Sequence, residues 1–176
     1  MTTTTLLSPS ATTQAAVAVL ADCLALLESI SQQHFTARSS VIAGSSIGQH
    51  VRHSLDHFSA AAGALGGDII DYDHRARNTP VENDLNAARQ EIVRLMRAIG
   101  SIAPDESERS VRVRVMLSGS GEEAELPSTL CRELAFASHH AVHHHAMIAA
   151  IAREMRLPVP ETFGKAPSTV NFERAR

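Results

Sequence analysis

The chain has 176 residues and a formal charge of −3, and 44% of its residues are hydrophobic while only 3% are aromatic. This length fits one domain, and a core of small and aliphatic side chains favours close helix packing over a β-sandwich. The charge gives no basic field for duplex DNA, so we expect no nucleic-acid partner.

The N-terminal third of the chain begins with a Thr/Ser-rich stretch, residues 1–10, which we expect to be flexible. A first helix is predicted from about Thr12 to Gln33, because apolar residues recur there every three or four positions. Its apolar run over 15–27 is short for a bilayer, contains Asp22 and follows no basic segment. We therefore expect a cytoplasmic protein with no membrane partner.

A second helix is predicted to begin at a Ser45 or Ser46 cap and to end at the glycine pair 66–67. One apolar stripe runs along it: Ile47, Val51, Leu55, Phe58 and Ala62. The polar stretch 68–78 that follows is predicted to be a loop.

The third helix has the clearest start signal, with Thr79 as N-cap, Pro80 at the first position and Glu82 at the third. Apolar residues then repeat at alternating spacings of four and three down the helix: Val81, Leu85, Ala88, Ile92, Leu95 and Ile99. This spacing predicts one amphipathic helix.

Residues 111–117 alternate between apolar and polar side chains, and residues 123–126 alternate back after the turn 118–121. This pattern predicts a small β-hairpin. A fourth helix is predicted from about Ser128 to Met155, followed by a Pro-rich tail over 157–176. We therefore expect a mainly α, single-domain four-helix bundle over 11–156, with the hairpin between helices three and four.

Eight of the ten histidines fall in two clusters, one on the second helix and one on the fourth. They are His50, His53 and His57, and then His139, His140, His143, His144 and His145. Two facing helices that carry histidines three or four residues apart can build a nitrogen-rich metal site.

On the fourth helix, His140 and His144 point the same way as the apolar residues around them. A single inward histidine is usually a hydrogen-bonded core residue, but two neutral imidazoles one turn apart favour a shared metal ion. We expect His139, His143 and His145 to lie around the site or on the surface.

On the second helix, His50 and His57 border the apolar stripe more closely than His53 does. Periodicity alone therefore favours His50 or His57 as the ligand, although a bundle helix can also carry a site beside its main stripe. For His57 we favour a solvent-edge position beside Asp56.

The stretch from Ser46 to Asp56 and the pair His140 and His144, in this order on a bundle, resemble the DinB-like superfamily of small bacterial metalloproteins. The resemblance implies a four-helix bundle that holds a divalent metal with three histidines. Matched to the motif, the ligands are His53, His140 and His144, with His50 as the alternative.

Three histidine ligands leave positions open for water or substrate, as in a catalytic site. The resemblance suggests a thiol-dependent S-transferase or a metal-assisted hydrolase. The alternative is a non-enzymatic metal-binding or stress-response protein in which the ion is structural. Imidazole ligands favour Zn or Ni, with Fe and Mn also compatible. We expect a small-molecule substrate, with a low-molecular-weight thiol as one candidate, and a homodimer is plausible.

Two further sets of residues are less specific. The loop from Tyr72 to Arg77, with Asp73, His74 and Arg75, is a candidate rim of the site, where an arginine could hold an anion. A solvated charged loop is the alternative. Cys23 and Cys131 lie in apolar helical patterns without CxxC spacing, so we expect buried thiols in preference to a disulfide or redox pair.

Overall fold

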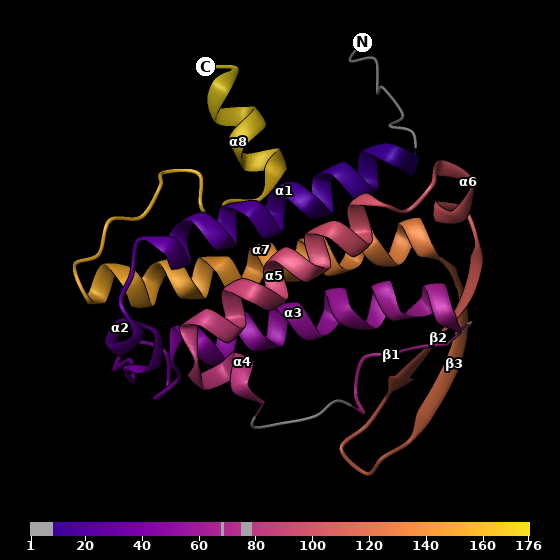
Figure 1. Ribbon diagram of the computed structural model, residues 1–176, viewed down its shortest axis with the longest axis horizontal. Coiled ribbons are helices and arrows are strands. Elements are labelled where there is room, and N and C mark those ends of the chain that lie inside the picture. Colours follow the sequence, from indigo (N-terminus) through magenta and orange to yellow (C-terminus); the bar gives the residue numbers. More distant parts are fainter. Residues whose placement is uncertain (1–8, 68, 75–78) are drawn as a thin grey trace.

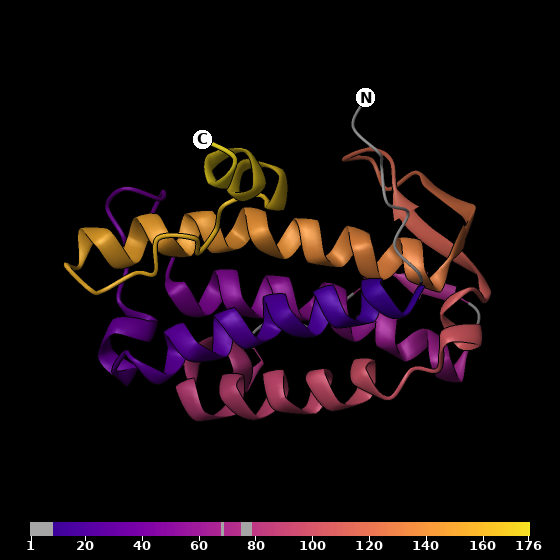
Figure 2. The ribbon, with the colours of Figure 1, turned by 90° about the horizontal axis from the view of Figure 1, so that it is seen from above.

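Four long helices lie along the longest axis of the molecule (Figure 1). They are α1 (Pro9–Glu28), α3 (Ile47–Gly63), α5 (Leu85–Gly100) and α7 (Leu130–Glu154). The computed structural model describes residues 9–67, 69–74 and 79–176. Both α1 and α3 pack against α5 and α7, so the four helices form a ring in the order α1, α5, α3, α7 (Figure 2). The predicted mainly α fold is confirmed.

The core of the bundle is mainly aliphatic, with Phe35 and Phe58 as fully buried aromatic rings. The helix α5 shows this most simply, because its buried residues recur three or four positions apart and are all apolar. They are Leu85, Ala88, Ile92, Leu95 and Ile99. The predicted stripe of the third helix is thus the buried face of α5.

The helix α1 contains an apolar window, Ala11–Glu28, which by length and composition alone could cross a membrane. The apolar stretch is therefore longer than the run over 15–27 that was recognised in the sequence. Leu20, Leu26 and Leu27 of this helix are buried within the bundle, and a core helix passes the same test, so the window is weak support for a membrane span. The expected flexible segment over 1–10 falls mostly on residues 1–8, which lie outside the described residues.

Two predicted helices are each divided in two. The first ends at Glu28, and a separate α2 (Gln32–Thr36) begins after Ser31, whose side chain accepts a hydrogen bond from the His34 backbone N–H. The third is interrupted after α4 (Pro80–Asn83), where Asp84 leaves the helical conformation and caps α5 through the Asn86 and Ala87 amides. Short polar residues compete for backbone amides in this way, which ends one helix and starts the next.

The predicted hairpin is confirmed as β2 (Ser110–Met116) and β3 (Glu123–Thr129), with Val113 opposite Leu126. A third strand, β1 (Ile69–Asp71), lies parallel to β2 and pairs Ile70 with Val113. The segment 68–78 was predicted as a loop, so β1 is a correction. A three-residue strand has too little alternation to be recognised in the sequence.

The chain after α7 turns back along the bundle and forms α8 (Pro167–Arg174), which stands beside α1 and α7 (Figures 1 and 2). The Pro-rich tail therefore contains a helix that was not predicted. The remaining short elements are η1 (Ala64–Gly66), which extends α3, and α6 (Pro104–Ser107), which precedes the hairpin.

Candidate metal centre

Three histidines of α3 face α7. The helix begins with a capping box, in which the Ser46 side chain accepts from the Gln49 amide and the Gln49 side chain accepts from the Ser46 amide. Its apolar stripe is buried from Ile47 to Phe58 and continues at Ala61 in place of the predicted Ala62. His50, His53 and His57 follow one another at spacings of three and four residues beside that stripe. These spacings place the three rings along one side of the helix.

Two pairs of imidazole nitrogens meet between the helices. The Nε2 atoms of His53 and His140 are 3.1 Å apart, and the Nδ1 atoms of His50 and His144 are 3.0 Å apart. Two nitrogens that bind one tetrahedral zinc ion at about 2.0–2.1 Å lie roughly 3.3–3.4 Å from each other. The two nitrogens of each pair would therefore have to move apart only slightly to bind one metal ion.

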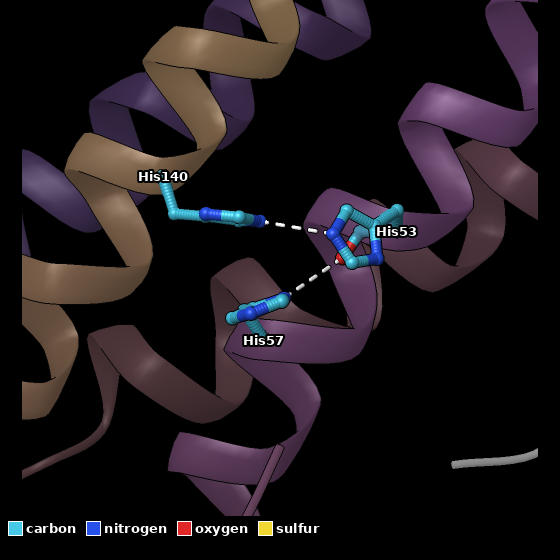
Figure 3. A group of neighbouring side chains, drawn as sticks. All are labelled: His53, His57 and His140. Atoms are coloured by element: carbon cyan, nitrogen blue, oxygen red, sulfur yellow. Dashed lines mark hydrogen bonds between the residues drawn. The ribbon is translucent and has the colours of Figure 1, made fainter. Parts of the chain in front are cut away.

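Figure 3 shows His53 and His57 on α3 with His140 of α7 opposite them. These three residues can each offer a nitrogen such that the three atoms lie within 4.8 Å of one another. The predicted ligands His53 and His140 therefore lie together. The third member of this group is His57, whereas the predicted third ligand is His144. The His50 alternative lies against His144, and its Nε2 contacts the Ser45 hydroxyl at 2.9 Å.

His144 and His57 differ in how their rings are oriented relative to His140. His53, His140 and His144 are mutually inclined by 56° to 73°, with ring centroids 4.5–5.0 Å apart. His57 instead stacks on His140, with centroids 3.9 Å apart and planes 28° apart. A ring nitrogen's lone pair lies in the ring plane, so two stacked rings cannot both direct lone pairs at one nearby ion. Inclined rings can, so the ring orientation is compatible with His144 as a ligand, whereas the nitrogen positions group His57 with His53 and His140.

His57 is not at the solvent edge, which corrects the sequence expectation. Its side chain is 6% exposed, because the ring lies between His140 and Tyr72. Asp56, the expected neighbour, instead accepts a hydrogen bond from Arg52. The His57 Nδ1 bonds to the His53 carbonyl oxygen at 3.0 Å, and since a carbonyl only accepts, Nδ1 carries the proton.

Burial and neighbouring imidazoles favour the neutral forms of His50 and His144 by lowering their pKa values. Burial, reinforced by His53 and His140, lowers the pKa of His144 to about 2. Burial and His143 lower the pKa of His50 as well. Neutral imidazoles are the form that binds a metal ion, so no proton has to leave these two rings before binding at neutral pH.

Tyr72 and Phe136 form an aromatic wall at one end of the cluster. Their centroids are 5.4 Å apart, and both rings contact His57. The Tyr72 hydroxyl donates to Glu133, a fully buried carboxylate on α7. Burial and this carboxylate raise the pKa of Tyr72. Glu133 was not among the predicted site residues, although an acidic residue at an inward position of an apolar helical pattern is a usable signal.

Asp73 and His74 of the predicted rim loop bond to residues of the sheet. Asp73 accepts a hydrogen bond from the Met116 amide, and the exposed His74 ring pairs with Asp71 and Glu123. Arg75 and Arg77 lie outside the described residues.

The other histidines of α7 differ from one another. His139 and His143 are exposed, as expected, and the His143 ring contacts His144. His145, however, is 3% exposed and stacks on Phe163 of the C-terminal segment. Burial lowers its pKa to about 4. The surface position expected for His145 is therefore wrong, because the returning tail covers it.

The cysteines Cys23 and Cys131 are free thiols. Cys23 is buried in the core as expected, and burial together with Asp22 raises its pKa to about 12. Cys131 is only partly buried, and its sulfur contacts the Thr129 hydroxyl.

Comparisons with known proteins show the fold. The crystal structure of a DinB-like protein from Bacillus subtilis matches with a TM-score of 0.62 at 16% identity, over 87% of this chain and 98% of that one. The chain therefore has a DinB-like fold, as the sequence resemblance predicted. The sequence matches no family model. The FK506-binding protein 5 of Rhizopus delemar is 37% identical over 107 residues, 58% of this chain. This chain covers 27% of that relative's length.

Proposed function

We propose that this protein, which has the DinB-like fold, binds one divalent metal ion through His53, His140 and His144 and uses it in catalysis. The observation that supports the proposal most directly is the approach of the His53 and His140 Nε2 atoms to 3.1 Å from two different helices. His144 is the third ligand in this proposal, because its ring is inclined to those of both His53 and His140. Zn or Ni suits three imidazoles best, and Fe or Mn is also compatible.

An ion held by three imidazoles would lower the pKa of a bound water to roughly 7, or bind and activate a thiolate. The side chains around it supply access and enclosure. His50, His53 and His140 are partly exposed, which leaves a route for a small molecule. Tyr72 and Phe136 wall off one end of the cluster. The reaction classes that fit are S-transfer with a low-molecular-weight thiol and metal-assisted hydrolysis.

A structural ion is the second candidate. The imidazole pairs join α3 to α7, so an ion bound between them would also hold these two helices together. In this alternative the protein is a non-enzymatic metal-binding protein. Its stability would then depend on the ion.

Metal content tests the ligand assignment. We expect one ion per chain in the wild type by elemental analysis, and loss of stoichiometric metal in His53→Ala, His140→Ala and His144→Ala. The matched control is His139→Ala, on the exposed side of α7, which should keep its ion. Full occupancy in His140→Ala or His144→Ala would overturn the site, and a larger loss in His50→Ala than in His53→Ala would make His50 the ligand.

Activity tests the function. Metal-loaded protein should accelerate the reaction of a low-molecular-weight thiol with an electrophile, or the hydrolysis of a small ester or amide, and chelated protein should not. Equal rates with and without the ion, across both substrate classes, would favour the structural alternative.

A further inference from the structure

Glu133 is a buried carboxylate that the proposed chemistry does not use. It has no exposed surface, although it lies in the first turn of α7 near the hairpin. Burying a carboxylate is costly unless donors compensate it. Its function should therefore be found in the groups that donate to it.

Three donors from three parts of the fold meet this carboxylate. They are the Tyr72 hydroxyl at 2.8 Å, the Ser128 hydroxyl of β3, and the Arg132 guanidinium at 2.7 Å. Arg132 is mostly exposed and Ser128 belongs to the hairpin, so both could serve only to join β3 to α7. Tyr72 differs from both, because its ring also contacts the histidine cluster.

A continuous stack runs from Tyr72 to a predicted metal ligand. The Tyr72 ring stacks on His57 with centroids 5.0 Å apart and planes 18° apart. His57 in turn stacks on His140. The backbone hydrogen bond from the His57 Nδ1 holds the middle ring from a second direction.

We propose that Glu133, Tyr72 and His57 are positioning residues that fix the ring plane of His140 for metal binding. Glu133 anchors the Tyr72 hydroxyl, Tyr72 supports His57, and His57 supports His140. The inference rests on the proposed metal site and assigns His57 a supporting role in place of a ligand role. Outer partners of this kind typically change metal affinity by 10- to 100-fold when removed.

The first experiment separates a supporting ring from a ligand. Co²⁺ is titrated into wild type, His57→Phe and His57→Ala, and the dissociation constant and visible spectrum are recorded. His57→Phe keeps a flat ring without a nitrogen donor, so we expect one ion, an unchanged spectrum and an affinity within a few-fold of wild type. His57→Ala should bind at least tenfold more weakly. Equal loss in both variants, with a changed spectrum for His57→Phe, would make His57 a ligand and overturn the proposal.

The second experiment tests the rest of the stack. Tyr72→Leu and Glu133→Gln should each weaken Co²⁺ binding by about tenfold, while Tyr72→Phe, which keeps the ring, should weaken it less than Tyr72→Leu. In a His57→Ala background, Tyr72→Leu should cause no further loss, because its effect passes through His57. A further loss of the same size would show that Tyr72 acts by another route.

Controls separate stability from positioning. Ile99→Ala shortens a buried side chain of α5, the helix diagonal to α7 in the ring, and should lower the melting temperature without weakening Co²⁺ binding. If Tyr72→Leu does not fold, Tyr72→Phe combined with Glu133→Gln provides the comparison, and wild-type affinity in that variant would overturn the proposal.

A wild type that binds no Co²⁺ or Zn²⁺ would refute the proposed site and this inference with it. Normal wild-type binding with unaffected Tyr72 and Glu133 variants would refute the inference alone.

Discussion

The buried faces of helices α5 and α7 differ in composition. Every buried residue of α5 is apolar, whereas α7 buries Glu133, Ser138, His144 and His145 among its apolar residues. Each of these four side chains contacts another part of the fold or its own helix: Glu133 bonds to Tyr72, Ser138 to the Leu134 carbonyl and His144 to His50, while His145 stacks on Phe163. The contrast suggests that stability comes mainly from helices such as α5, which lets α7 carry polar groups that function needs.

The largest effect should come from α5. Leu95→Ala opens a cavity in the aliphatic core and should lower the free energy of unfolding by about 2–5 kcal/mol, measured by denaturant titration with chelator present. His140→Ala on α7, where the ring is partly exposed, should cost less than about 1 kcal/mol under the same conditions. A larger loss for His140→Ala than for Leu95→Ala would contradict this division between the helices.

Metal removal should have a moderate effect. An ion at a hundred times its dissociation constant adds about 2.7 kcal/mol to stability by mass action. Because the core is aliphatic, we expect chelated protein to stay folded and to melt in one cooperative transition, followed by circular dichroism. Collapse of the fold on chelation would favour the structural ion over the catalytic one.

The helix α3 offers a smaller test. Ser46→Ala removes the capping hydrogen bond to the Gln49 amide and should cost about 1 kcal/mol of unfolding free energy. Ser46→Asp, which can restore the cap, is the matched control. Since the cap lies one turn before His50, Co²⁺ affinity should change by only a few-fold in either variant, and a total loss would show that α3 depends on its cap to place the histidines.

The smallest effect concerns pH and the far end of α7. Hydrogen bonds from the Ser39 and Ser40 hydroxyls and the Ser40 amide lower the pKa of Glu154 from 4.5 to about 2. A lowered carboxylate pKa stabilises the fold above the unfolded value, and that contribution is lost as pH falls from 4.5 toward 2. Hydrogen exchange of the Ser40 amide, corrected for intrinsic rates, should therefore accelerate over this window. Glu154→Gln should remove the pH dependence, and identical profiles would exclude this carboxylate as the cause.

The same contrast explains what could be predicted from the sequence. The apolar face of α5 and the hairpin were recognisable because local periodicity determines them, although the break at Asp84 that divides the predicted third helix was missed. Periodicity and motif agreed on His140, whereas His53 followed from the motif alone, because periodicity favoured His50 or His57. The contacts of Tyr72 with Glu133 and His57, and the inward turn of His57, could not be found in this way, because they join segments far apart in the chain, as does the burial of His145 under Phe163.

The two glutamates that bracket α7 have a consequence for variation in chain length. Glu133 is bound to Tyr72 and Ser128 at one end, and Glu154 to Ser39 and Ser40 at the other, about 30 Å away at 1.5 Å per residue. One residue inserted between them would turn everything downstream by about 100° around the helix axis. It would misplace either His144 or the Glu154 carboxylate. Insertions and deletions should therefore be tolerated in the exposed hairpin turn and rejected between these two glutamates.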